Sequence, residues 1–260
     1  MAKVLVIGEN SFIGKHLKKY DRISFRDIDS IDFGKYDVVI NCALNPLYKT
    51  NKYHNINDID LKVGQYACAN NCHFVMLSTS KVYGSDNYLR IYDEFSAPKP
   101  DDHYGTNKLI TENILLSNYP ENVTILRGSN IFGFEYGRNS FTGYCMSQIV
   151  NEGVVNLTIT GNLKRDFLFV EDAVKLIELV CEVKPKGVYN LSSGVGLPII
   201  DFIHWLIAGY RYDIEVLRTT KDDRQFILDN SKLQKALNVK IGPFDYEKIL
   251  YNLGKQLCKI

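Results

Sequence analysis

Short apolar runs alternate along the chain with longer stretches in which apolar and polar positions are interleaved. Each run is rich in β-branched or aromatic residues and is bounded by polar residues or glycine, a pattern typical of strands buried on both faces of a parallel sheet. The runs predict strands over residues 3–8, 37–43, 73–79, 123–129 and 187–193. The interleaved stretches predict helices over residues 12–20, 57–70, 104–117, 140–152, 171–182, 199–208 and 231–237.

This alternation of strands and helices favours an α/β fold with a doubly wound parallel sheet. A further strand is expected to end within "SFRDI", at residues 24–28. From there to the next clear strand the chain is short for a full crossover, so we expect one helix to be trimmed or absent. The region after residue 133 is less regular, and we expect much of it to form a smaller lobe at the sheet edge.

Composition and charge narrow the class of protein. The 260 residues are 45% hydrophobic and 23% charged with a formal net charge of +1, which gives no global electrostatic case for binding nucleic acid or an anionic membrane. The first residues lack the long apolar region of a signal peptide, and no apolar run approaches the ~18 residues of a membrane span. The six scattered cysteines are expected to be buried free thiols rather than metal ligands. These features favour a cytoplasmic protein without a metal site.

The first predicted strand leads into a turn with two glycines, "GENSFIG", at residues 8–14. In a dinucleotide-binding turn the first glycine permits the tight turn, the second lets the backbone approach the pyrophosphate, and the third lets the helix pack on its strand. Gly8 and Gly14 supply the first and third, whereas Ser11 replaces the second. Taken alone, the turn predicts either a dinucleotide site next to a helix N-terminus or a plain strand-to-helix corner. The dinucleotide contacts expected from it are Gly8, Asn10, Ser11, Phe12, Ile13 and Gly14.

A tyrosine and a lysine in "HYGTNKLITENIL" carry the candidate chemistry. Tyr104 and Lys108 are four residues apart and therefore share one face of the predicted helix 104–117. An ammonium beside a phenol favours the phenolate, which makes the phenol a usable proton donor near neutral pH. The lysine can also hold a ribose hydroxyl and so position a nicotinamide.

The strand that ends in "LSTSKVYG" places the hydroxyls of Ser78, Thr79 and Ser80 at the carboxyl edge of the sheet. With Tyr104 and Lys108, this strand end resembles the Ser/Thr…Tyr-x-x-x-Lys triad of the extended short-chain dehydrogenase/reductase family, in its nucleotide-sugar branch of epimerases, dehydratases and ketoreductases. The resemblance continues through "LRGSNIFG" (126–133), "RDFLFVEDAVKLIEL" (165–179), "VYNLSSG" (188–194) and "DNSKLQKALN" (229–238). Each motif alone is weak evidence for the family, but their order along the chain makes them jointly specific. The resemblance therefore implies that the turn at residues 8–14 is a dinucleotide site rather than a plain strand-to-helix corner.

The family resemblance implies a Rossmann-like fold in two parts. The dinucleotide-binding domain is expected over residues 1–132 with a return segment at about 168–192, and a small substrate-binding lobe over 133–167 and 193–260. The predicted helices 57–70 and 104–117 resemble those that pair two subunits in this family, so a homodimer is expected.

The resemblance also assigns roles to single residues. Thr79, Tyr104 and Lys108 become the catalytic triad, and the last two also touch the dinucleotide. Further dinucleotide contacts are expected from Cys42, Ala43 and Leu44. The substrate is expected to be a nucleotide-diphosphate sugar, whose diphosphate suits fork-shaped guanidinium groups. The expected substrate contacts are Thr79, Ser80, Lys81, Asn130, Arg165 and Arg224, with Arg218 as the alternative to Arg224.

The cofactor is expected to be NADP(H), with NAD(H) as the alternative. NAD sites usually show an acidic residue about 20 residues past the turn. Here Arg26 falls near that position, where an arginine accommodates a 2′-phosphate. Asp27 and Ile28 are expected to frame the adenine.

One departure from the family pattern bears on the reaction. The 4,6-dehydratases of the family follow the threonine with Asp and Glu, which supply acid and base, whereas Ser80 and Lys81 stand here. Dehydration is therefore disfavoured. The favoured hypothesis is a reductase of a nucleotide-diphosphate 4-keto sugar in surface-glycan precursor synthesis, in which hydride goes to C4, Tyr104 gives the proton and Thr79 polarises the carbonyl.

Three alternatives remain open from the sequence. A 4-epimerase needs the same triad and a tightly held NAD. A reductase coupled to epimerisation beside the keto group needs an extra acid/base pair, for which Lys81 and Glu135 lie nearby by motif position. A regulator that binds dinucleotide without turnover is disfavoured by the intact triad, because such a protein has no need of the phenol.

Overall fold

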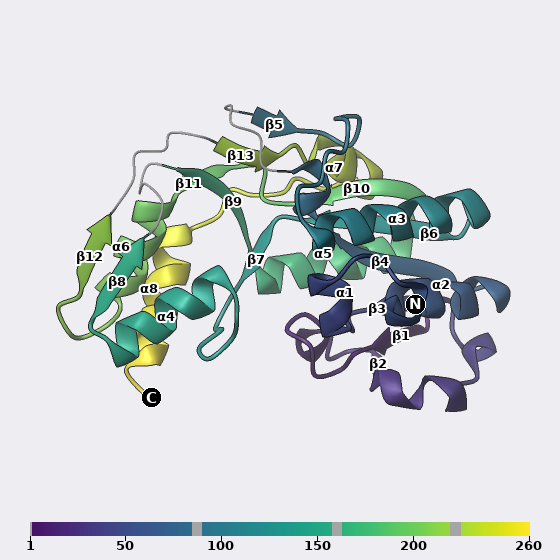
Figure 1. Cartoon of the computed structure of the whole chain (residues 1–260), viewed down its shortest axis with the longest axis horizontal. Helices are drawn as coiled ribbons and strands as arrows, with labels where there is room; N and C mark the ends of the chain where they lie inside the picture. The colour runs from purple at the N-terminus through teal and green to yellow at the C-terminus, as the bar shows by residue number, and fades with distance from the viewer. Residues whose placement is uncertain (1, 85–89, 158–162, 219–224) are drawn as a thin grey trace.

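A sheet of parallel strands forms the centre of the molecule in the computed structural model, which describes residues 2–84, 90–157, 163–218 and 225–260 (Figure 1). Within these residues the sheet has six strands in the order β10-β6-β4-β3-β1-β2. They are β1 (Val4–Ile7), β2 (Asp21–Ile23), β3 (Val38–Asn41), β4 (His73–Thr79), β6 (Val123–Gly128) and β10 (Gly187–Leu191). Every neighbouring pair is parallel, which confirms the predicted Rossmann-like α/β fold.

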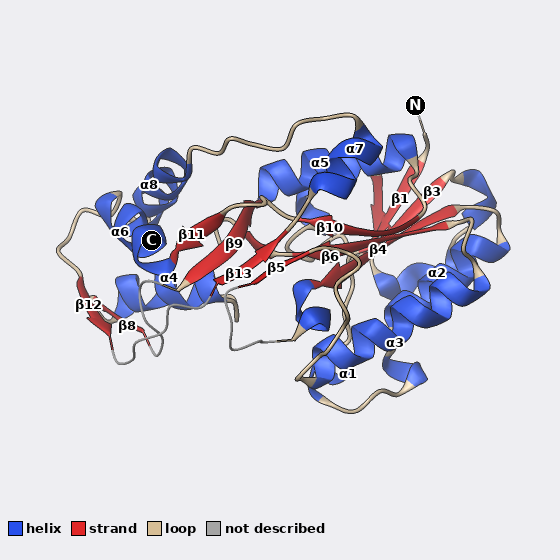
Figure 2. Ribbon diagram, turned by 90° about the horizontal axis from the view of Figure 1, so that it is seen from above, coloured by secondary structure: helices blue, strands red, loops and turns tan. Residues whose placement is uncertain are grey.

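Helices cover both faces of this sheet (Figure 2). Helices α2 (Ile59–Ala69) and α3 (His103–Asn118) pack on one face, and α5 (Val170–Val183) and α7 (Ser231–Leu237) pack on the other. Neighbouring residues of β1 alternate between the two cores, because side chains of a strand point to opposite faces in turn. The strand order reverses between β1 and β3, and the carboxyl ends of strands at such a reversal are where α/β proteins bind ligands.

The predicted helix over 12–20 is wrong. That stretch forms a single 3₁₀ turn at Gly14–His16, and β2 begins at Asp21. The Ser11 hydroxyl accepts a hydrogen bond from the Gly14 N–H at 3.0 Å, which closes the turn locally. Leu17 is fully buried in a core that it shares with α5. The interleaved apolar positions of this stretch therefore reflect core packing around a short connection.

The trimmed second crossover is confirmed, since two 3₁₀ helices, Phe25–Ser30 and Phe33–Lys35, take the place of an α-helix between β2 and β3. A short helix, α1 (Pro46–Thr50), follows β3. The other predicted helices form close to their expected limits.

A second group of elements lies beyond the end of the main sheet (Figures 1 and 2). Its helices are α4 (Phe141–Asn151), α6 (Ile199–Ala208) and α8 (Tyr246–Leu257), the last of which was not predicted. Its larger sheet consists of β5 (Arg90–Tyr92), β7 (Asn130–Phe132), β9 (Lys164–Phe169), β11 (Gly196–Pro198) and β13 (Gln225–Leu228), and its smaller one of β8 (Val154–Leu157) and β12 (Glu215–Arg218). An aromatic core holds the group together, with ring centroids 4.5 Å apart for Phe167 and Phe202 and 5.2 Å apart for Phe132 and Phe202.

Asp166 joins this group to the end of β10. Its fully buried carboxylate accepts hydrogen bonds from the Ser193 N–H and hydroxyl at 2.9 and 2.8 Å, the Gly194 N–H at 3.1 Å and the Leu228 N–H at 3.3 Å. Burial raises the pKa of Asp166, and the hydrogen bonds from Ser193 oppose this shift. Asp166, which belongs to the motif "RDFLFVEDAVKLIEL", therefore has a structural role: its carboxylate ties β9 to the loop after β10 and to β13.

None of the helices within the described residues has the length and apolar character needed to cross a membrane. All six cysteines lie in the described part of the chain and are free thiols, as predicted. Only Cys72, Cys145 and Cys181 are buried, whereas Cys42, Cys68 and Cys258 are partly exposed.

Candidate active site

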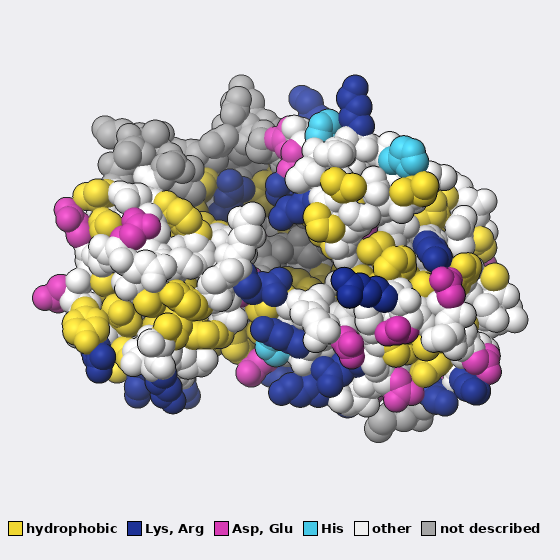
Figure 3. Space-filling model, turned by 60° about the horizontal axis from the view of Figure 1, so that its bottom comes forward, with side chains coloured by type: hydrophobic (Ala, Val, Ile, Leu, Met, Phe, Trp, Pro, Cys, Tyr) yellow, Lys and Arg dark blue, Asp and Glu magenta, His cyan; other side chains and the backbone are white. Residues whose placement is uncertain are grey.

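A cavity of about 370 Å³ opens at the carboxyl ends of β1, β3, β4 and β6, at the reversal of strand order. The surface is hollowed between the main-sheet part and the second group, and Lys and Arg side chains gather around the hollow (Figure 3). The residues that line the cavity are Ser11, Phe12, Ile13, Asn41, Cys42, Ala43, Leu44, Leu77, Ser78, Thr79, Tyr104, Lys108, Gly128, Ser129, Asn130, Ile131 and Ser140. The cavity therefore brings together the first turn, the strand ends and the start of α3.

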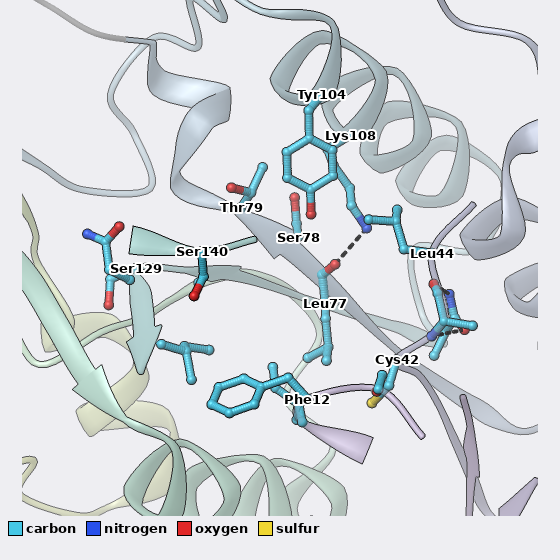
Figure 4. A pocket seen from close by; sticks show the side chains of 17 residues that line it. Phe12, Cys42, Leu44, Leu77, Ser78, Thr79, Tyr104, Lys108, Ser129 and Ser140 are labelled. Carbon is cyan, nitrogen blue, oxygen red and sulfur yellow. Dashed lines mark hydrogen bonds between the residues drawn. The ribbon is translucent and has the colours of Figure 1, made fainter. Parts of the chain in front are cut away.

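The three predicted catalytic residues meet in this cavity. Thr79 is the last residue of β4, and Tyr104 and Lys108 lie on the first turns of α3. Figure 4 shows the phenol of Tyr104 pointing into the cavity on the side of the Ser78 and Thr79 hydroxyls. The start of α3 is fixed by Asp102, whose carboxylate accepts a hydrogen bond from the Gly105 N–H at 2.7 Å.

Lys108 is held from behind by two acceptors. Its Nζ lies 2.5 Å from Asp60 Oδ2. The same Nζ donates to the Leu77 carbonyl at 2.8 Å (Figure 4). The same Nζ lies 5.8 Å from the centre of the Tyr104 ring. Burial, the largest effect, lowers the pKa of Lys108, but Asp60, Tyr104 and Asp58 together raise the pKa of Lys108 above its usual value. The ammonium beside the phenol is therefore a permanent charge in this fold.

A second buried ion pair lies behind β4. Arg127 donates to both carboxylate oxygens of Glu112, with a 2.7 Å bond from Nη2 and bonds of 3.1 and 3.3 Å from Nε, and the Ser78 hydroxyl donates to the same carboxylate. Burial opposes the charge on Arg127, but its bonds to Glu112 raise the pKa of Arg127 overall. Tyr104, Lys108 and Glu112 follow at intervals of four residues, so one face of α3 carries both the candidate acid and the two charged groups behind it.

Most of the predicted dinucleotide contacts line the cavity. Ser11, Phe12 and Ile13 come from the first turn, and Cys42, Ala43 and Leu44 follow β3. Burial raises the pKa of the Cys42 thiol to about 12, which favours the thiol over the nucleophilic thiolate.

Gly8 and Gly14 do not line the cavity, but the turn requires both. Gly8 has φ +92°, and a Cβ there would lie 2.6 Å from the Ala43 nitrogen. A Cβ at Gly14 would lie 2.3 Å from the Gly8 carbonyl oxygen. These glycines let the turn and the strand ends approach each other closely.

The remaining dinucleotide predictions lie away from the cavity wall. Asn10, Arg26 and Asp27 are exposed, the last two in the 3₁₀ helix just after β2. Ile28 is buried in the core beside Phe33. The structure therefore brings neither Arg26 nor Ile28 to the walls of the 370 Å³ cavity.

A second cavity of about 420 Å³ adjoins the first through Asn130, which lines both. Four of the predicted substrate contacts, Ser80, Lys81, Asn130 and Arg165, line it together with Gly84, Asp101, Asp102, Phe141, Phe167, Ile199 and Phe226. The Arg165 guanidinium lies 5.6 Å from the centre of the Phe226 ring. Lys81 forms an ion pair with Asp102, the residue that caps α3.

Two predicted arginines and one predicted acid remain to be considered. Arg224 falls outside the described residues, and the backbone of Arg218 belongs to β12 in the smaller sheet of the second group. Glu135 is buried, lies 3.7 Å from the Arg138 Nε and lines neither of these two cavities. Burial raises the pKa of Glu135, partly offset by the hydrogen bond with Ser140.

Sequence reasoning missed Asp60, Asn41 and Glu112. Asn41 ends β3 and lines the first cavity, and its position at a strand end was a usable signal. Asp60 and Glu112 lie on helices, where an acidic residue is ordinary. Their partners Lys108 and Arg127 are 48 and 15 positions away, which only the fold brings together.

Similar proteins were found among curated sequences. CDP-abequose synthase of Salmonella typhimurium is 26% identical over 142 residues, which is 51% of this chain and 47% of the relative. The dTDP-D-glucose 4,6-dehydratase of Dictyostelium discoideum is 24% identical over 260 residues, covering 76% of this chain and 60% of the relative. The chain spans between 37% and 60% of the lengths of the curated relatives it matches.

Similar structures cover nearly the whole chain. A UDP-N-acetylglucosamine 4-epimerase of Methanobrevibacter ruminantium M1, in complex with UDP-N-acetylmuramic acid, has a TM-score of 0.82 at 21% identity and covers 99% of this chain and 98% of its own. RMD of Pseudomonas aeruginosa, complexed with NADPH, has a TM-score of 0.75 at 20% identity and covers 98% of this chain and 99% of its own. These likenesses support the fold.

The sequence model of one family matches residues 21–192, a stretch that runs from β2 through the last residues of the main sheet and includes Thr79, Tyr104 and Lys108. The match covers well over half of the chain. The chain therefore belongs to the NAD dependent epimerase/dehydratase family.

Proposed function

We propose that the chain is an NAD(P)H-dependent reductase of a nucleotide-diphosphate 4-keto sugar. The observation that carries the proposal is the meeting of Thr79, Tyr104 and Lys108 in one cavity that adjoins a second cavity through Asn130. The first cavity has the position expected for a dinucleotide, at the reversal of strand order. The second contains an arginine over an aromatic ring, which suits a phosphorylated ligand.

The residues present fit a nicotinamide dinucleotide. Gly8 and Gly14 keep the turn close to the strand ends, and Lys108 lines the cavity with its charge intact. When bound, the reduced nicotinamide supplies the hydride.

The protein's own residues supply the remaining steps. Tyr104 donates its phenolic proton to the oxygen at C4 as that oxygen gains charge, and Thr79 donates a hydrogen bond to the same oxygen. Lys108 stabilises the phenolate that Tyr104 becomes. Asn130 and Arg165 hold the diphosphate on the side of the second cavity.

Reduction is favoured over dehydration by the residues that follow Thr79. Ser80 and Lys81 both line the second cavity, and Lys81 is paired with Asp102. A hydroxyl and a paired ammonium do not replace the carboxylic acid and carboxylate that eliminate water. The coupled epimerisation by Lys81 and Glu135 is not proposed, because Glu135 is buried outside both cavities.

NADP(H) is the proposed cofactor, with NAD(H) as the alternative. The exposed Arg26 follows β2, beside the strand whose end carries the turn, and a cation there can pair with a 2′-phosphate. We further propose that the protein acts in the cytoplasm as a homodimer, paired through α2 and α3, which pack side by side over one face of the sheet (Figure 2).

A 4-epimerase is the second candidate function. It would use the same triad, and a UDP-N-acetylglucosamine 4-epimerase is among the similar structures. The two functions differ in the fate of the cofactor, because a reductase consumes its hydride whereas an epimerase regains it at each turnover.

Cofactor state therefore tests the proposal. The protein is purified without added nucleotide and denatured, any released dinucleotide is identified, and the native protein is titrated with NADPH and NADH. A reductase is expected to be empty as purified, to bind NADPH in preference, and to oxidise it when given a 4-keto sugar nucleotide. Tightly held NAD carried through purification, with interconversion of C4 epimers, would instead establish the epimerase.

A further inference from the structure

A buried carboxylate behind the catalytic lysine has no role assigned so far. Asp60 lies on the first turn of α2, and its Oδ2 is 2.5 Å from the Nζ of Lys108. The two side chains are only 3% and 4% exposed, respectively. Asp60 itself does not line the cavity, so it cannot touch a substrate or cofactor there directly.

The hydrogen bonds of Lys108 leave one direction for its remaining donor. An ammonium has three N–H groups. Asp60 and the Leu77 carbonyl accept two of them, both from the protein side of the site. Lys108 also lines the cavity, so its third N–H is the one available to a bound ligand.

The second oxygen of Asp60 is used as well. Asp60 Oδ1 accepts a hydrogen bond of 2.7 Å from the Asn41 side-chain amide. Asn41 in turn binds Ala43 twice, accepting from its N–H at 3.0 Å and donating to its carbonyl at 3.1 Å. Asn41 and Ala43 both line the cavity. One carboxylate therefore fixes the lysine on α3 and the turn that follows β3.

We propose that Asp60 is a positioning residue of this site. Its buried carboxylate holds Lys108 charged, with one N–H directed at a ribose hydroxyl of the bound dinucleotide, and through Asn41 it fixes the turn that follows β3. This inference rests on the proposed dinucleotide site, but it does not require that the reaction be a reduction. It adds to the triad a residue that never touches the reacting atoms.

The electrostatics of the pocket agree with this role. The groups facing the Lys108 ammonium are the Asp60 carboxylate, the more distant Asp58 carboxylate, and the rings of Tyr104 and Tyr48 at 5.8 Å each. Burial lowers the pKa of Lys108, and Asp60 is the largest effect that raises it. Without the carboxylate, burial dominates and the lysine loses its proton at a lower pH.

The Asp60→Asn variant tests the proposal, with Asp58→Asn as its matched control. Asp58 is a buried carboxylate two residues earlier, which accepts from Leu61 N–H at 2.9 Å and the Tyr53 hydroxyl at 3.0 Å rather than from Lys108. The measurement is the dissociation constant of NADPH, by nicotinamide fluorescence, from pH 6 to pH 10.

The expected result is a pH dependence that is strongest in Asp60→Asn. In that variant NADPH affinity should fall by up to about tenfold per pH unit once Lys108 deprotonates, within a range where the wild type stays level. In Asp58→Asn, which removes only the more distant charge, the fall should begin at a higher pH than in Asp60→Asn. A uniform loss of affinity at all pH values would overturn the proposal, because it would mean that Asp60 only supports the structure. Unchanged affinity would overturn it as well.

Two other outcomes, absence of turnover and failure of the variant to fold, are distinguished from a change in NADPH affinity. Absence of turnover on every 4-keto sugar would refute the reductase but leave the NADPH titration informative. If Asp60→Asn does not fold, the wild type carries the test: in protein with ¹³C-labelled lysine, the signal assigned through Lys108→Arg should not titrate up to about pH 10, where ordinary lysines begin to do so. Titration of Lys108 below that pH would overturn the proposal.

Discussion

The ion pair of Arg127 and Glu112 allows a sharp prediction about stability. Glu112 accepts three bonds from Arg127 and one from Ser78, and only 1% of its side chain is exposed, against 6% for Arg127. The Glu112→Gln variant keeps the shape but removes the charge, and Arg127 stays protonated because a guanidinium does not titrate in the accessible range. An uncompensated buried charge costs about 3–5 kcal/mol. Against a typical total stability of about 5–15 kcal/mol, this is a large loss.

The chain offers a matched control. Glu121 pairs with Lys186 at the surface, where the two side chains are 74% and 54% exposed. Exposed pairs contribute about 0–1 kcal/mol, because solvent screens them and two long side chains must be ordered. Glu121→Gln is therefore expected to be close to neutral.

Urea unfolding followed by circular dichroism measures both variants. We expect Glu112→Gln to lower the free energy of unfolding by about 3–5 kcal/mol, equivalent to roughly 6–20 °C in melting temperature for a chain of this size. The double variant Glu112→Leu/Arg127→Met should recover most of the loss, because it removes both charges. Equal, small effects of Glu112→Gln and Glu121→Gln would refute the argument from burial.

Two further predictions concern the phenol and a buried histidine. Tyr104→Phe should lower turnover, measured by NADPH oxidation, by about 10²–10⁴-fold. The dissociation constant of NADPH should stay unchanged, because the substitution removes only the proton donor. Full turnover in this variant would exclude Tyr104 as the acid. Burial lowers the pKa of His73 from 6.5 to about 4, helped by Lys184 and Lys186. Neutral His73 therefore contributes fully to the free energy of unfolding above pH 6.5. This contribution, about 3 kcal/mol in total, is lost as the pH falls toward 4. Urea unfolding at pH 7 and pH 4.5 should show that loss in the wild type and much less of it in His73→Gln; an equal loss in both would contradict the assignment.

The sequence was informative where the determinants are local. The buried strands show as continuous apolar runs, and the pair Tyr104 and Lys108 shows as a four-residue interval on one helix. The amphipathic helix α8 was also readable, since Tyr246, Leu250 and Leu253 recur at helical spacing and are buried. It was missed although the signal was there.

Other features depend on partners that are distant in sequence. The stretch 12–20, predicted as a helix, forms only a 3₁₀ turn, and its Leu17 is buried in a core shared with α5, more than 150 residues further along the chain. The strands β7 and β11 are three residues long and exist through their pairing with β9. The buried pair of Lys108 and Asp60 has the same origin, so a complete list of site residues requires the fold.

The late position of β10 in the chain has a consequence for synthesis on the ribosome. β10 pairs with β6 at the edge of the main sheet, and α5, which precedes it, covers the core face that includes Val4 and Val38. A nascent chain that ends before Gly187 therefore leaves β6 as an open edge, and one that ends before α5 also leaves this apolar face uncovered. Open edges beside apolar surface recruit other chains. The half that carries the dinucleotide turn therefore keeps an open edge and an uncovered apolar face until most of the protein has been translated.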